Sequence, residues 1–106
     1  MTPAPRVAII ARLIVSRDAL AEFRAFETAA AAIMRGHGGR IEQTVVLDAS
    51  DSSPTLTEVH IVTFPNASAY AGYRDDPALA QLQPVRARAV VSTQVEIGVE
   101  GPGYGN

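Results

Sequence analysis

The chain contains no cysteine and no lysine, and aromatic residues make up only 6% of its 106 residues. Without cysteine it can form no disulfide, no thiolate nucleophile and no cysteine-ligated metal site. Its nine basic residues are arginines scattered along the chain, and the net charge is −2. This distribution lacks the basic stripe of nucleic-acid-binding proteins and the basic arm of membrane-surface proteins, so we expect neither kind of partner.

Long hydrophobic runs are absent as well. No apolar run approaches the roughly 20 residues that a transmembrane helix needs, and the run after the N-terminal MTPAPR is too short for a signal-peptide core. We therefore predict a cytoplasmic location. The hydrophobic share of 47% and the charged share of 19% are typical of a folded globular chain. At this length we predict a single domain over residues 1–106, with flexible tails at 1–6 and 100–106.

Four short runs rich in β-branched residues predict strands, and two stretches between them predict helices. In the first helical stretch an apolar stripe recurs at helical spacing, and Ser16 is the expected N-cap. In the second, Asn66 is expected to cap a helix over 67–74, and Asp76-Pro77 to start another helical turn. The predicted strands lie at 7–15, 39–48, 56–64 and 90–99, and the stripe consists of Ala19, Phe23, Phe26, Ala30 and Ile33.

The order β-α-β-β-α-β predicts an α+β fold, the ferredoxin-like βαββαβ arrangement. Right-handed crossovers then give a four-stranded antiparallel sheet, in the order fourth, first, third, second strand, with the helices on one face. The other face would expose Ala8, Ile10 and Ile14 with no layer to cover them. Soluble monomers rarely leave such a patch open, so we predict a homodimer through the sheet face.

Several segments resemble a known superfamily in their order and spacing. Across residues 7–101 the chain is similar to the dimeric α/β-barrel superfamily, and most similar to the short bacterial "domain of unknown function 1330" proteins. It departs from them at Tyr73-Arg74-Asp75-Asp76, and the related antibiotic-biosynthesis-type monooxygenases share the same plan. The resemblance implies a homodimer with a barrel-like pair of sheets and no established reaction. The segments are HGGR (37–40), TFPNASAYAGYRDDPAL (63–79), PVRARAV (84–90) and TQVEIGVEG (93–101).

Polar residues within the strands are the candidates for a site. The second and fourth strands each have an apolar set that suits the side under the helices, so their polar residues should turn to the uncovered face. Four polar side chains are expected to converge there: Arg12, His60, Gln94 and Glu96. The two apolar sets are Ile41, Val45 and Leu47, and Val91, Val95 and Ile97.

Two interpretations of this polar group remain open. In one, it is an ion-paired, partly hydrated dimer interface. In the other, it forms a pocket in which His60 is a general base and Arg12 holds an anionic or enolate oxygen, with Gln94 and Glu96 contacting the ligand. Tyr70 and Tyr73 share one helical face and are expected to pack against the sheet or to reach the same ligand.

Motifs for metals and cofactors are absent from the sequence. The two histidines, His37 and His60, sit in no metal-binding spacing, and no glycine-rich loop opens a helix after a strand, so we expect no metal and no cofactor. Two functional classes remain. One is a cofactor-independent monooxygenase, isomerase or cyclase acting on a small cyclic or aromatic metabolite. The other is a non-catalytic small-molecule-binding or accessory dimerisation module. A haem-degrading enzyme ranks lower, because His37 lies beyond the helix end.

Overall fold

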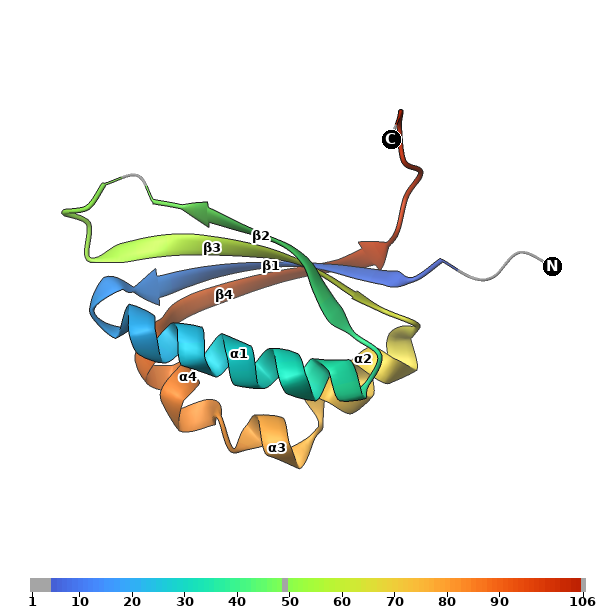
Figure 1. Ribbon diagram of the computed structural model, residues 1–106, viewed down its shortest axis with the longest axis horizontal. Helices are drawn as coiled ribbons and strands as arrows, with labels where there is room; N and C mark the ends of the chain where they lie inside the picture. The colour runs from blue at the N-terminus through green and yellow to red at the C-terminus, as the bar shows by residue number, and fades with distance from the viewer. Residues whose placement is uncertain (1–4, 49, 106) are drawn as a thin grey trace.

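The computed structural model describes residues 5–48 and 50–105 as one antiparallel sheet with helices on one side (Figure 1). Every predicted strand and helical stretch is present in the predicted order, which confirms the βαββαβ fold. The strands are β1 (Val7–Ser16), β2 (Arg40–Leu47), β3 (Thr55–Phe64) and β4 (Val90–Val99). The helices are the 3-10 turn η1 (Arg17–Ala19), α1 (Leu20–Gly36), α2 (Ala67–Arg74), α3 (Pro77–Ala80) and α4 (Gln83–Ala89).

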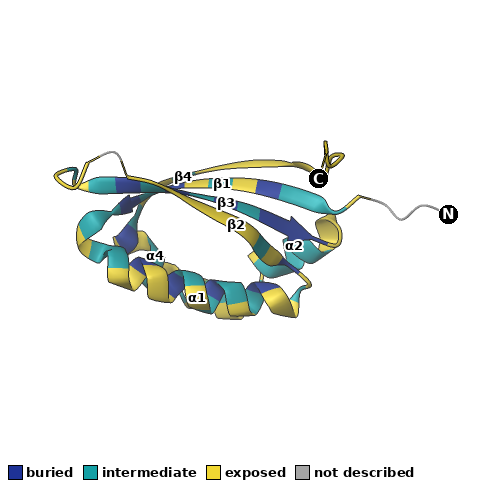
Figure 2. Ribbon diagram, turned by 45° about the horizontal axis from the view of Figure 1, so that its top comes forward, coloured by how far each residue is buried: buried dark blue, intermediate teal, exposed yellow. Residues whose placement is uncertain are grey.

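The strand order β2-β3-β1-β4 matches the predicted order, with β1 and β3 in the centre. Figure 2 shows that the helices lie along one face, and that buried residues gather in the two central strands and on the sheet side of α1. Antiparallel pairing aligns Ile9 of β1 with Val62 of β3, and Leu13 with Glu58. Residues opposite one another share a face, so the odd-numbered residues of β1 and the even-numbered residues of β3 face the helices.

The core lies between α1 and the two central strands. The predicted stripe on α1 is buried at Phe23, Phe26 and Ala30, and Met34 extends it by one turn. Each large apolar side chain buried in this way contributes about 1.5–3 kcal/mol relative to an exposed one. The stripe, together with Phe64 at the end of β3, therefore fixes α1 against the sheet.

The start of the first helix differs from the prediction. Strand β1 continues through Ser16, and the 3-10 turn η1 separates it from α1, so Ser16 makes no side-chain capping bond. The turn is held instead by Arg17, whose side chain donates to the Ser53 carbonyl at 2.7 Å and forms an ion pair with Asp48 at 2.6 Å. That pair holds the pKa of Asp48 below its usual range.

The corner between β3 and α3 is capped as predicted. Asn66 Oδ1 accepts a hydrogen bond from the Ala69 amide at 2.8 Å, and Asp76 Oδ1 accepts one from the Ala78 amide at 2.9 Å. The second oxygen of Asp76 lies 2.8 Å from Nε2 of His37, which follows α1. This bond lowers the pKa of Asp76 and ties the corner to the end of α1.

The prediction for the faces of β2 is wrong in part. The register slips between Ile41 and Gln43, so that Glu42 is the extra residue of a β-bulge. Because side chains alternate with a period of two, the bulge leaves Ile41 under the helices but sends Val45 and Leu47 to the uncovered face. Both are exposed there, at 39% and 46%.

For β4 the prediction holds in part. Val95 and Ile97 pair with Ala11 and Ile9 on the helix-covered face, whereas Val91 falls in a register shift and pairs with no residue of β1. All three remain exposed, because β4 is an edge strand.

The ends of the chain are only partly described. Residues 1–4 and 106 of the predicted tails lie outside the described residues, as does Ala49 of the β2–β3 loop. At the described ends, the Glu100 amide donates to the Arg6 carbonyl at 3.0 Å, which extends the β1–β4 pairing by one step. No helix in the described part of the chain is long and apolar enough to cross a membrane.

Candidate functional site

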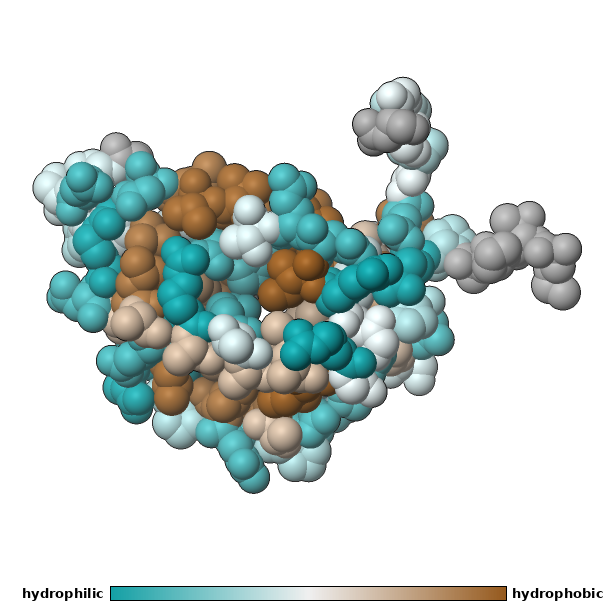
Figure 3. Space-filling view, in the orientation of Figure 1, coloured by the Kyte–Doolittle hydropathy of each residue, from teal (hydrophilic) through white to brown (hydrophobic). Residues whose placement is uncertain are grey.

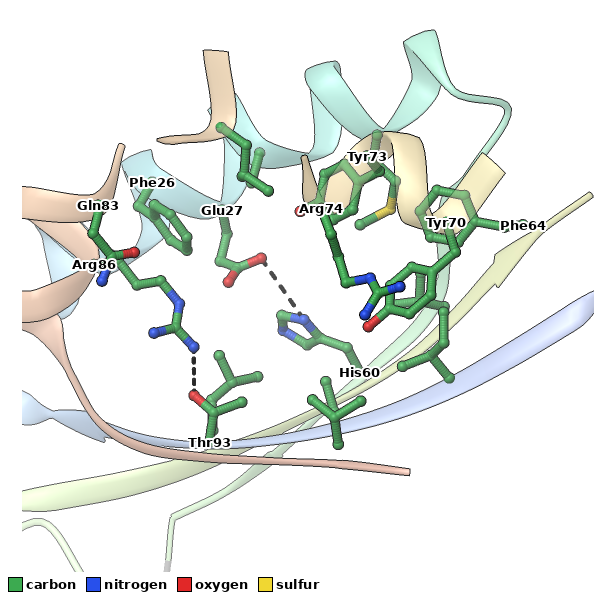
Figure 4. A pocket seen from close by; sticks show the side chains of 18 residues that line it. Phe26, Glu27, His60, Phe64, Tyr70, Tyr73, Arg74, Gln83, Arg86 and Thr93 are labelled. Atoms are coloured by element: carbon green, nitrogen blue, oxygen red, sulfur yellow. Dashed lines mark hydrogen bonds and ion pairs between the residues drawn. The ribbon is translucent and has the colours of Figure 1, made fainter. Parts of the chain in front are cut away.

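A cavity of about 270 Å³ lies between the sheet and the helices (Figure 4). Strands β1, β3 and β4 form its floor, and the four α-helices form its roof and rim. This volume is just below the roughly 300–1,000 Å³ typical of ligand sites, so the cavity suits a small molecule. Its apolar lining includes Ile9, Phe26, Met34, Val62, Phe64 and Leu79.

A buried carboxylate–imidazole pair lies beside the floor. Glu58 and His60 are two residues apart on β3, so both face the helices, and they are only 3% and 4% exposed. His60 Nε2 lies 2.8 Å from Glu58 Oε1. An ionised carboxylate can only accept a hydrogen bond, so Nε2 is the donor in this pair. The other ring nitrogen, Nδ1, is then left for a partner on the cavity side.

A second carboxylate faces that nitrogen from α1. Glu27 Oε2 lies 3.7 Å from His60 Nδ1, as the dashed line in Figure 4 indicates. This separation is too long for a hydrogen bond. Burial raises the pKa of Glu27, and the charge of Glu58 raises it further, whereas His60 and Arg86 act against the shift. A carboxyl group with a raised pKa beside an imidazole is suited to general acid–base chemistry.

Arg24 connects this buried group to the helix surface. Its Nη2 lies 3.4 Å from Glu58 Oε2, an oxygen that is buried and accepts no hydrogen bond. The Arg24 side chain is half-exposed, whereas that of Glu58 is not. Ionisable side chains therefore follow one another from the surface to the cavity in the order Arg24, Glu58, His60 and Glu27. The positive charge of Arg24 near Glu58 offsets part of the cost of burying that carboxylate.

Tyr70 and Tyr73 of α2 form one wall of the cavity. Their ring centroids lie 5.3 and 5.5 Å from that of Phe64, so both tyrosines pack against the sheet as expected and also line the cavity. Burial, followed by the charge of Glu27, raises the pKa of Tyr73 to about 12. The Tyr73 phenol is therefore protonated at neutral pH and can serve as a hydrogen-bond donor.

Two arginines stand at the rim. The guanidinium of Arg74 lies 4.5 Å above the Tyr70 ring. Arg86 of α4 reaches β4 and donates from Nη2 to Thr93 Oγ1 at 2.6 Å. Gln83 also lines this side of the cavity, one helical turn before Arg86.

The predicted convergence of Arg12 with His60 is wrong. The register pairs His60 with Ala11, which faces the helices, whereas Arg12 pairs with Val59 on the other face. Gln94 lies directly opposite Arg12, and Glu96 lies opposite Ile10, so both belong to the uncovered face as predicted. The structure therefore brings Arg12, Gln94 and Glu96 together and separates them from His60 by the thickness of the sheet.

The residues predicted from the sequence did not include Glu27 and Arg86, which line the cavity. A signal for Glu27 was present, because it falls between Phe23 and Ala30 at helical spacing and so interrupts the apolar stripe with a carboxylate. Arg86 had no comparable signal, because its contact with Thr93 depends on how α4 turns into β4. Among the described residues, no group of three or more potential ligands is placed to hold a metal ion.

Comparisons with known proteins find similarity in structure. No family model matches the chain. No curated protein matches it either. SnoaB, a cofactor-independent oxygenase from Streptomyces nogalater, is 14% identical with a TM-score of 0.69, over 97% of this chain and 100% of that one. The RPA0582 protein of unknown function from Rhodopseudomonas palustris is 13% identical with a TM-score of 0.74, over 94% and 86%.

A third similar structure is a candidate antibiotic biosynthesis monooxygenase from Nitrosomonas europaea, which is 13% identical with a TM-score of 0.70 over 94% of both chains. At these identities the likeness establishes the fold. Two of these three structures are described as an oxygenase and a candidate monooxygenase, and the other as a protein of unknown function. The narrower resemblance to the "domain of unknown function 1330" proteins is not confirmed.

The raised pKa of Glu27 predicts a pH-dependent effect of Glu27→Gln. Below the usual carboxyl pKa of about 4.3 the side chain is neutral in both folded and unfolded chains, so variant and wild type should differ little. As the pH rises through the folded-state pKa, the wild type must ionise a buried group and loses stability that the amide retains. Thermal unfolding should show that the Tm of Glu27→Gln exceeds that of wild type by more at pH 8 than at pH 4.

The matched control is Glu22→Gln on the same helix, where the carboxylate is exposed and pairs with Arg88. This variant should show no gain at pH 8. A Glu27→Gln protein that is less stable than wild type at pH 8 would contradict the prediction, because it would mean that His60 stabilises an ionised Glu27.

Proposed function

We propose that the protein is a small homodimeric oxygenase that needs no cofactor and acts on a small aromatic substrate. The observation that carries the proposal is the buried Glu58–His60–Glu27 series beside an aromatic-lined cavity. The likeness to the cofactor-independent oxygenase SnoaB supports the reaction class. The cavity volume of about 270 Å³ favours a substrate of one to three fused rings.

In the proposed mechanism, His60 is the base. Its Nε2–H is engaged by Glu58, which fixes the tautomer and strengthens Nδ1 as a proton acceptor. The substrate hydroxyl approaches Nδ1 from the cavity, and its proton passes to the imidazole as the aromatic anion forms. The resulting imidazolium is stabilised between the two carboxylates. The protonated Tyr73 donates a hydrogen bond to the anion.

The electron-rich anion then reacts with dioxygen. With 1-naphthol as the example, the anion transfers an electron to dioxygen, and the radical pair combines at ring carbon 4 to form a peroxide anion, which takes the proton back from the His60 imidazolium. Loss of water breaks the O–O bond and leaves a carbonyl. The balance is C10H8O + O2 → C10H6O2 + H2O, with one oxygen atom in the quinone and the other in water. The same proton removal without dioxygen would serve an isomerase or a cyclase, and the likeness to SnoaB favours the oxygenase.

The uncovered sheet face supports the homodimer. Ile10 and Val45 are 45% and 39% exposed on this face of the single chain, and Ile61 lies beside them. Figure 3 shows apolar side chains gathered over β2 and β3 at the upper edge of the molecule. A second copy placed sheet to sheet would cover this patch, and Arg12, Gln94 and Glu96 could make hydrogen bonds across the interface.

Oxygen consumption tests the proposed reaction. Wild-type protein should consume dioxygen with 1-naphthol and form one quinone per dioxygen molecule. His60→Gln and Glu27→Gln should each lower the rate by about 10²–10⁴-fold, because both act in the proton transfer. Arg88→Gln, on the exposed side of α4, should leave the rate unchanged. Tight binding of naphthols without oxygen uptake would contradict the oxygenase and favour a non-catalytic binding module.

Light scattering during size-exclusion chromatography tests the homodimer. Wild type should elute with twice the chain mass of 11.2 kDa. Ile10→Asp places a charge in the proposed interface and should give a monomer. Ile97→Asp makes the same change at an exposed position, but on the helix-covered face, and should remain dimeric. A monomeric wild type, or dimer loss in both variants, would contradict an interface on the uncovered face.

A further inference from the structure

The two arginines at the cavity rim differ from most others in the chain. Among the described residues, no carboxylate oxygen lies within 4.0 Å of the side-chain nitrogens of Arg74 or Arg86. Both residues line the cavity. The arginines that do have a carboxylate partner within that distance are Arg6, Arg17, Arg24, Arg40 and Arg88.

Arg74 and Arg86 are stabilised in different ways. Arg74 is exposed and lies over the Tyr70 ring, which provides an attractive face for its charge. Arg86 is half-buried and is held by a neutral hydroxyl, that of Thr93. The charge of Arg86 favours the ionised form of Glu27, but no carboxylate among the described residues contacts the guanidinium directly, so its remaining donors are free for a ligand.

The fixed position of Arg86 makes it suitable for recognition. The bond from Nη2 to Thr93 uses one of the five guanidinium N–H groups and orients the plane of the others. The remaining donors can bind both oxygens of a planar anion, which is the strongest form of arginine–carboxylate contact. Gln83, one turn earlier on α4, adds an amide donor on the same side of the cavity.

The other charges of the cavity determine where an anion can bind. Glu27 and His60 occupy the region between α1 and β3, and a ligand carboxylate beside Glu27 would be repelled. Figure 4 shows Arg86 and Thr93 together on the β4 side of this pair, with the guanidinium directed toward the cavity. A ligand can therefore place a carboxylate against Arg86 and its ionisable hydroxyl beside His60.

We infer that Arg86, oriented by Thr93 and assisted by Gln83, binds a carboxylate of the ligand, so that the substrate class is a small aromatic hydroxy acid. This inference rests on the proposed site and narrows its substrate. A neutral phenol would fill the aromatic part of the cavity but make no charge-assisted contact with the guanidinium of Arg86.

The test compares two probes that differ only in the carboxylate, 5-hydroxy-1-naphthoate and 1-naphthol, by calorimetric titration. Wild-type protein should bind the hydroxynaphthoate at least about 10-fold more tightly, since a charge-assisted contact is lost without the carboxylate. Arg86→Gln should remove this preference and leave the affinity for 1-naphthol unchanged. Thr93→Val should reduce the preference, because it frees the guanidinium.

Two controls keep the outcome interpretable. Arg88→Gln makes the same change of charge on the same helix at an exposed residue that pairs with Glu22, and it should retain the full preference. If Arg86→Gln does not fold, as judged by thermal unfolding, Arg86→Lys replaces it. That variant keeps the positive charge but lacks the planar guanidinium that can bind both carboxylate oxygens. It should therefore lose most of the preference for the hydroxynaphthoate.

Equal affinity of wild type for the two probes would overturn the inference, and so would a preference that disappears in Arg74→Gln but persists in Arg86→Gln. Neither result depends on turnover, so both are distinct from failure of the oxygenase proposal. That failure would appear as unchanged oxygen concentration in the presence of a bound hydroxynaphthoate.

Discussion

The antiparallel register between β1 and β3 is the constraint on which the site depends. It pairs Ala11 with His60 and Leu13 with Glu58, which places the carboxylate–imidazole pair under the helices and Arg12 on the opposite face. A slip of one residue in β3 would exchange its two faces. Glu58 and His60 would then lie on the uncovered face, far from Glu27. His60 is the only histidine among the described residues that line the cavity, so the cavity would lose its imidazole.

The burial of Glu58 with His60 is better explained by function than by stability. An apolar pair of similar size would pack at this position without desolvating two ionisable groups, and such replacements are often neutral or stabilising. The chain limits the cost with a 2.8 Å hydrogen bond between the two side chains and with Arg24 near the second Glu58 oxygen. The side chains that line the cavity also lack packing contacts that they would make in a filled core. Both features are consistent with a site that binds and deprotonates a small molecule.

Much of the fold could be predicted from local chemistry, because strand composition, the α1 stripe and the Asn66 and Asp76 caps are properties of short segments. It was harder to predict which face of the sheet each strand residue occupies. On β3 both alternating sets mix polar and apolar residues, so a buried His60 has the same pattern as an exposed one. On β2 the bulge at Glu42 inverts the alternation. The contact between Arg86 and Thr93 depends on the path from α4 to β4, which no pattern in the sequence specifies.

The most direct test of this account is the NMR signal of the His60 ring in ¹⁵N-labelled protein. The chain has only two histidines, so a His37→Gln variant identifies the His60 signals. The account predicts a protonated Nε2 whose proton exchanges slowly with water, and a clear change of that signal in Glu58→Gln. A ring proton that exchanges as fast as that of an exposed imidazole, or a signal that Glu58→Gln leaves unchanged, would contradict the buried pair and with it the proposed base.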